Sequence, residues 1–315
     1  MRNKKMKKGE MTSAQIIGLV ILAVSFAVIL IFIFAYPWKS DISREACHEQ
    51  IVLRSTANFR YSDALSKAIP IDKCKTRKVC LSMSGNDCEE FGPSTDSDIV
   101  EKIKIANKED VKNAFAEELY LCNSMVGGGN LDFLPSNWGD SKYCPPCARI
   151  AFDKEAKEKL NDISYYELYK KMYATVDNDG RRFLEAVYPG MSSPEYALDI
   201  FKGAQKEDAS LKLEDWKIKI KNDGGYIIIV SIGKEGTIGT WLAAGGVAIG
   251  TLAILTGIGA PIGMGILYAS GIAGGAVLYY SYPGADGKLD YAPPFIIPYN
   301  LQSLKTLGCT DFGWA

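Results

Sequence analysis

The chain has 315 residues, a formal net charge of -1 and 23% charged residues. This length suits one or two domains, and no basic stripe with interleaved aromatic residues indicates a nucleic-acid partner. Its only histidine is His48. Histidine-rich metal sites are therefore excluded, and Ser-His or Cys-His catalysis would depend on that one side chain.

An apolar run from Ile16 to Tyr36 follows five basic residues at the N-terminus. Its length is close to that of a membrane span, and it exceeds the apolar core of a cleaved signal peptide. Basic residues ahead of a span favour the cytoplasmic side of the membrane. The pattern predicts a cytoplasmic tail over residues 1–15, a transmembrane anchor over residues 16–38, and export of the domain that comes after the anchor.

The first residues also carry a short motif. Lys7-Lys8-Gly9-Glu10 precedes Met11–Gln15 and a long aliphatic stretch. This resembles the amino end of archaeal type IV pilin-like proteins, in which a peptidase cuts after the glycine and the helix then packs into a filament core. The resemblance implies processing after Gly9. Those proteins often carry glutamate where this chain has Ala14, and the departure favours the alternative of a simple signal anchor.

Residues 39–236 have an ordinary globular composition, and about 195 residues suffice for a core. Apolar spacing and end signals predict six helices, over Ser40–Phe59, Lys108–Met125, Lys154–Asn161, Ser164–Ala174, Ser193–Gly203 and Leu301–Leu307. Alternating or β-rich segments predict strands over Lys73–Met83, Asp98–Ile105, Ala148–Asp153, Asp215–Lys221, Tyr226–Ile232 and Phe295–Tyr299. Asn222–Gly225 predicts a β-hairpin. The exported domain is therefore expected to be α+β, with a small antiparallel sheet.

Residues 237–283 contain no Asp, Glu, Lys or Arg. They are long enough for two membrane-spanning helices, with a break at Gly257–Pro261. Small residues at four-residue spacing allow close helix packing, and the packing candidates are Gly246, Gly250, Gly265, Gly271 and Gly275. We expect a glycine-rich transmembrane helical hairpin over this range and an outer tail over residues 284–315.

The eight cysteines are Cys47, Cys74, Cys80, Cys88, Cys122, Cys144, Cys147 and Cys309. The expected topology places all eight in one oxidising compartment, where disulfides persist. An even count agrees with full pairing. The turn at Ser84–Asp87 suggests that Cys80 bonds with Cys88, and the remaining connectivity is left open.

The sharpest chemical motif is Cys144-Pro145-Pro146-Cys147, which we call the CPPC motif. Two thiols at this spacing can exchange disulfides, hold a metal with a second ligand pair, or form structural disulfides. A thiol-exchange motif of the thioredoxin type sits at a helix start, whereas Ala148–Asp153 is strand-like. No second cysteine pair has the same spacing. Structural disulfides are the favoured interpretation.

The other candidate motifs are weak. Asp177–Gly180 resembles part of a calcium loop, but the ligand positions at both ends of an EF-hand do not fit, so we expect a plain turn. Gly284–Lys288 is too short for a phosphate-binding loop. Glu117 and Glu118 fit a solvated helix face, and His48 fits a packing or surface role. The sequence identifies no catalytic, cofactor-binding or metal-binding residues.

Four segments carry a resemblance over most of the chain: Cys47–Arg54, Cys74–Cys80, the CPPC motif and Pro298–Cys309. They resemble uncharacterised cysteine-containing membrane proteins of small-genome archaea, which implies no known activity. We expect a non-enzymatic, membrane-anchored structural or assembly protein at the cell surface, as part of a pilus-like or secretion complex. Its partners would be the lipid bilayer and either its own copies or other membrane proteins. The alternatives are a pore built by the glycine-rich hairpin and an exported thiol oxidoreductase.

Overall fold

The computed structural model describes residues 21–27, 39–60, 69, 71–92, 100–134, 142–207, 212–234, 282–283 and 289–314. The chain divides into two compact units, Met1–Ser43 and Arg44–Ala315. In the first unit, residues 21–27 are helical. The predicted cleavage site after Gly9 lies outside the described residues.

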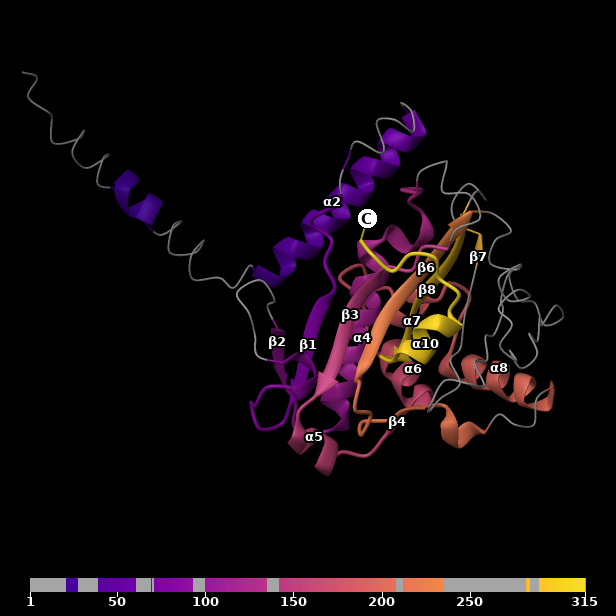
Figure 1. Ribbon diagram of the computed structural model, residues 1–315. Coiled ribbons are helices and arrows are strands. Elements are labelled where there is room, and N and C mark those ends of the chain that lie inside the picture. The colour runs from indigo at the N-terminus through magenta and orange to yellow at the C-terminus, as the bar shows by residue number, and fades with distance from the viewer. Residues whose placement is uncertain are drawn as a thin grey trace, which may run out of the picture. The chain divides into compact units, whose positions relative to one another are not determined.

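The second unit is built on a six-stranded sheet with the spatial order β2-β1-β3-β6-β8-β7 (Figure 1). The strands are β1 Arg77–Ser82, β2 Val100–Lys104, β3 Pro146–Phe152, β6 Tyr226–Lys234, β7 Tyr282–Pro283 and β8 Leu289–Pro298. β1 pairs in parallel with both β2 and β3. The contacts from β3 through β6 and β8 to β7 are antiparallel. The sheet is therefore mixed.

Helices form around this sheet and in the segments that join its strands. The α-helices with a label are α2 Lys39–Arg60, α4 Lys108–Met125, α5 Lys154–Lys159, α6 Tyr165–Ala174, α7 Phe183–Val187, α8 Pro194–Glu207 and α10 Leu301–Thr306. Three short 3-10 helices are η1 Glu89–Phe91, η2 Gly127–Gly129 and η4 Leu213–Asp215. The predicted helices at α2, α4, α5, α6, α8 and α10 are confirmed, whereas α7 was not expected.

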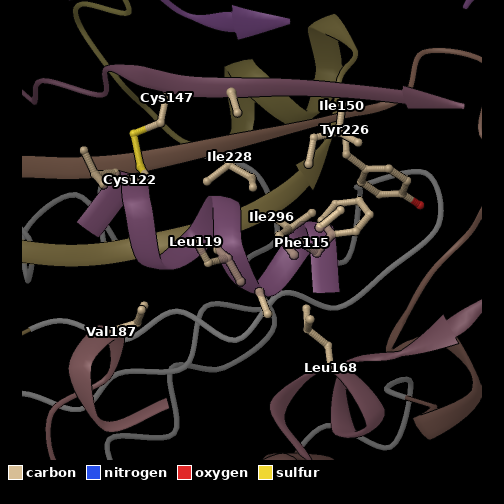
Figure 2. Packing of buried hydrophobic residues seen from close by; sticks show 14 of the residues in the cluster. Phe115, Leu119, Cys122, Cys147, Ile150, Leu168, Val187, Tyr226, Ile228 and Ile296 are labelled. Carbon is tan, nitrogen blue, oxygen red and sulfur yellow. A yellow bond between two sulfur atoms is a disulfide. The ribbon is translucent and has the colours of Figure 1, made fainter. Parts of the chain in front are cut away.

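The central helix α4 joins β2 to β3 and packs on one face of the sheet. It begins where predicted because the Asn107 side chain accepts hydrogen bonds from the backbone N–H groups of Glu109 and Asp110, in a capping box. Phe115 and Leu119 are fully buried, and the Phe115 ring lies next to Tyr226 of β6, with the centroids 6.0 Å apart (Figure 2). Full burial of side chains of this size contributes roughly 1.5–3 kcal/mol each.

The fold-class prediction was wrong in two respects. The sheet is mixed rather than antiparallel, because β1 lies between two parallel neighbours that are distant along the chain. In addition, none of the helices in the described parts of the chain combines the length and the apolar composition needed to cross a membrane. Residues 282–283, placed at the end of the expected membrane hairpin, form β7 instead, where Tyr282 pairs with Tyr291.

The remaining predictions for the apolar segments concern residues that the structure does not describe. Outside residues 21–27, the expected anchor over residues 16–38 is not described. The same holds for residues 237–281, which include every one of the five glycines proposed to pack helices, Gly246, Gly250, Gly265, Gly271 and Gly275.

The turn at Asn222–Gly225 forms, but it does not connect two strands of one ladder. The preceding strand, β5 Lys217–Ile218, pairs with β4 Ile163–Ser164 in a separate two-stranded sheet. Trp216, directly before β5, is fully buried, and its ring stacks on Phe201 with the centroids 4.8 Å apart. Its carbonyl oxygen accepts a hydrogen bond from the N–H of Tyr165, the residue after β4, at 3.2 Å.

The described residues before and after the glycine-rich segment belong to the same sheet, as β6 on one side and as β7 and β8 on the other. Lys234, the last residue of β6, pairs with Leu289, the first residue of β8. β8 therefore belongs to the same sheet as β6, and it lies between β6 and β7.

Candidate functional site

All eight cysteines are paired, and the chain has no free thiol. The four disulfides are Cys47–Cys74, Cys80–Cys88, Cys122–Cys147 and Cys144–Cys309. The predicted bond between Cys80 and Cys88 is confirmed, and it spans the turn that suggested it. The two cysteines of the CPPC motif are bonded to distant residues and not to each other.

The CPPC motif enters the sheet at the start of β3. Tyr143 exchanges two backbone hydrogen bonds with Ile232, at 2.8 and 2.9 Å. On the other side, the Cys144 N–H donates to the carbonyl oxygen of Asp311 at 2.8 Å. The carbonyl oxygen of Pro146 accepts hydrogen bonds from the Trp314 indole at 2.9 Å and the Thr76 hydroxyl at 3.0 Å. The motif is therefore held between β6 and the C-terminal segment.

The two cysteines of the motif belong to opposite faces of the sheet. Cys147 lies in the core cluster on the α4 side, together with its partner Cys122, and Figure 2 shows this bond joining α4 to β3. Cys144 lies in the cluster on the other face with Ile227 and Ile229, and its partner Cys309 packs against that cluster. The Cys122–Cys147 bond thus links α4 to one face of the sheet, and the Cys144–Cys309 bond links the C-terminal segment to the other face.

This arrangement disfavours thiol exchange with a substrate. A redox pair of this type needs two sulfur atoms that can bond to each other and an attacking thiol within reach of solvent. Here Cys144 is 0% exposed and Cys147 is 6% exposed, and the residues after the motif form a strand rather than a helix start. Through its two disulfides the motif crosslinks the sheet to α4 and to the C-terminal segment.

A buried lysine next to the motif was missed in the sequence. Lys142 is 2% exposed, and its Nζ donates a hydrogen bond to the carbonyl oxygen of Leu307 at 2.8 Å. Its backbone carbonyl accepts a hydrogen bond from the Thr310 N–H at 2.9 Å. Burial lowers the pKa of Lys142 from 10.5 to about 7. Nothing in the local sequence distinguishes this lysine from a surface lysine.

A buried ion-pair network was also missed. Arg77 of β1 bonds to Glu118 of α4 and to Glu101 of β2. Glu118 is 5% exposed, and burial raises its pKa, although the charges of Arg77 and Arg44 oppose that rise. The helical pattern had suggested a solvated face for Glu118. The network joins α4 to β1 and β2 at the edge of the sheet.

A second buried carboxylate caps a helix. Asp153 is 1% exposed and accepts hydrogen bonds from the hydroxyls of Ser82 and Ser84, both at 2.7 Å, and from the Ala156 N–H at 2.8 Å. Burial alone would raise the pKa of Asp153, but these hydrogen bonds outweigh it and lower the pKa to about 2. The residue stabilises the start of α5.

Two weak candidates have structural roles. Asp177 accepts hydrogen bonds from the backbone N–H groups of Asp179 and Arg181, and Gly180 has a φ of 78°, so this segment is the plain turn that was predicted. Nδ1 of His48 lies 3.0 Å from the carbonyl oxygen of Met125, at the end of α4. Within the described parts of the chain, no group of three His, Cys, Asp or Glu side chains is arranged to hold a metal ion.

Comparison with protein-family models, curated proteins and solved structures finds no match to this chain.

Proposed function

We propose that the protein is an exported, non-enzymatic domain that assembles with copies of itself or with other proteins at the cell surface. The observation that carries the proposal is the pairing of all eight cysteines in four disulfides. Proteins with several disulfides are typical of oxidising compartments outside the cytosol. They are rare in the cytosol, where cellular thiols keep cysteines reduced. Seven of the eight cysteines are buried and Cys309 is partly buried, which favours a stabilising rather than a catalytic role.

The helix at residues 21–27 supports the assembly part of the proposal. Its exposed apolar side chains are Ile21 at 61%, Leu22 at 71%, Val24 at 58% and Phe26 at 60%. Clustered exposed apolar side chains favour association with a protein partner. Residues 7–15, directly before this region, resemble the amino end of pilin-like proteins, in which such helices pack on one another. The resemblance therefore agrees with a partner that presents a similar helix.

The export part is tested on the full chain isolated from its native cells, with free thiols blocked by alkylation during lysis. The expected result is no alkylation and a mass about 8 Da below that of the reduced chain, since each disulfide removes two hydrogens. Labelling by an impermeant amine reagent on intact cells should modify exposed lysines. Eight alkylated cysteines, or no labelling of intact cells, would contradict export.

The assembly part is tested by chemical crosslinking and sedimentation of the full chain. We expect oligomers, and we expect Leu22→Glu together with Phe26→Glu to reduce them to monomers, because the charges oppose burial of the helix. Thr56→Glu, at an exposed position of α2, is the matched control. If the parent protein is monomeric and crosslinks to nothing, assembly is not its function.

A further inference from the structure

The two disulfides of the CPPC motif interleave along the chain. Cys122 bonds with Cys147, and Cys144 bonds with Cys309. The next cysteine along the chain after Cys122 is Cys144, and Cys122 does not bond with it. If cysteines paired in the order in which they emerge, Cys122 would bond with Cys144, which would leave Cys147 for Cys309. We call this alternative the swapped isomer.

Chain entropy does not select the native pairing. The native separations are 25 and 165 residues, and those of the swapped isomer are 22 (144 minus 122) and 162 (309 minus 147). Because the closure probability of a flexible loop falls as about the 3/2 power of its length, Cys122 meets Cys144 roughly 1.2 times as often as Cys147. An unfolded chain therefore forms the two bonds at similar rates.

The folded sheet does select the native pairing. Cys122 and Cys147 share the cluster on the α4 face, whereas Cys144 belongs to the opposite face, against which Cys309 packs. The backbone on both sides of the motif is fixed, since Tyr143 pairs with Ile232 and Arg149 pairs with Ile227. The swapped isomer would need bonds that pass through this ladder, so the native fold excludes it.

We propose that the CPPC motif is an internal exchange relay that corrects this pairing while the chain matures. An external disulfide first oxidises Cys122 and Cys144, and it takes up two electrons and two protons. The Cys147 thiolate then attacks the sulfur of Cys122. The Cys122–Cys147 bond forms, the Cys122–Cys144 bond breaks, and Cys144 leaves as a thiolate that takes up a proton.

That exchange involves no net oxidation, and its rate depends on the thiolate fraction of the attacking cysteine. A second external disulfide oxidises Cys144 and Cys309 once the C-terminal segment has docked. The spacing of the motif places an attacking thiol three residues from the leaving one. This role goes beyond the proposed surface function, because it concerns how the chain reaches its native bonds.

The test is oxidative refolding of the reduced full chain in a mixture of reduced and oxidised glutathione, with samples alkylated at successive times. Trypsin cuts after Lys142 and Arg149 and releases the motif in one peptide. Fragmentation of that peptide ahead of Pro145 in tandem mass spectrometry separates its two cysteines, so each isomer is identified. The expected early ratio of swapped to native Cys122 bonds is about 1.2, and the swapped form should then decay as the native form rises.

Among the molecules whose Cys122 is bonded to Cys144 or to Cys147, a thiol-free oxidant such as diamide should trap roughly half in the swapped form, because no thiolate remains to exchange. If the native bonds form from the earliest time with either oxidant and the swapped isomer is never seen, the relay does not exist. The refolding experiment uses purified protein, so its outcome does not depend on the compartment in which the protein resides. Failure of the relay proposal can therefore be distinguished from failure of the export proposal.

Two double variants isolate the exchange step. Cys144→Ser with Cys309→Ser removes the competitor of Cys147, so Cys122–Cys147 should form directly, without the delay that the exchange step imposes on this bond in the parent chain. Cys80→Ser with Cys88→Ser removes one disulfide but keeps the competition, so the swapped intermediate should remain. Loss of the intermediate in the variant that lacks Cys80 and Cys88, where Cys144 is still present, would overturn the assignment to this motif.

Discussion

Replacement of Lys142 by methionine should change how stability depends on pH. The Nζ is buried, and burial lowers the pKa of Lys142 from 10.5 to about 7. Below pH 7 both the folded and the unfolded chain carry the proton, and the folded chain bears the full cost of burying the charge. Between pH 7 and pH 10.5 the unfolded chain binds more protons, so the free energy of unfolding rises with pH.

Each unit of pKa corresponds to 1.36 kcal/mol, so the whole effect is on the order of 5 kcal/mol, of which roughly half falls between pH 6 and pH 9. Lys142→Met should lack this increase. The hydrogen bond to Leu307 is lost from the variant at every pH, and the difference in its strength between the charged and the neutral amine is already part of the pKa shift.

The assay is urea unfolding of the oxidised full chain at pH 6, 7, 8 and 9, followed by tryptophan fluorescence. The difference in unfolding free energy between variant and parent is compared across pH. Lys104→Met, which removes an exposed lysine of β2, is the control for loss of one charge. If the difference for Lys142→Met changes by less than about 0.5 kcal/mol between pH 6 and pH 9, the buried amine is not the cause.

Three further changes test other parts of the fold. Asp153→Asn should lower the unfolding free energy by about 2 kcal/mol at pH 7, and the loss should shrink as pH falls from 3.8 toward 2, because the unfolded parent chain takes up a proton in that range while the folded carboxylate stays ionised. Gly225→Ala should destabilise by more than Gly180→Ala in chemical denaturation, since both glycines have positive φ but only at Gly225 would a Cβ overlap the carbonyl oxygen of Ile150. Replacement of residues 235–288 by Asn-Gly joins the ends of β6 and β8 directly, so all four disulfides should still form. Mass spectrometry with alkylation checks this, and free cysteines in the shortened chain would contradict it.

Local patterns in the sequence were sufficient for the elements that depend on near neighbours. The helix from Lys108 to Met125 was predicted with its observed bounds, because its apolar spacing and its Asn107 cap are encoded within a few residues. The Cys80–Cys88 bond was predicted for the same reason, since one turn separates the two cysteines. The strand at Tyr226 and the extended segment at Phe295 were likewise found.

Only the tertiary structure decided which segments meet. Sequence periodicity gives the face of a strand but not its neighbour, so the parallel pairing of β1 and the association of β5 with β4 were not found. The faces occupied by Cys144 and Cys147 depend on α4 and the C-terminal segment, which lie far away in sequence. Lys142 differs from a surface lysine through its burial and through hydrogen bonds with Leu307 and Thr310, which lie far away in sequence. The sequence thus determined local structure and the number of cysteines, and long-range packing decided what each cysteine and each buried charge does.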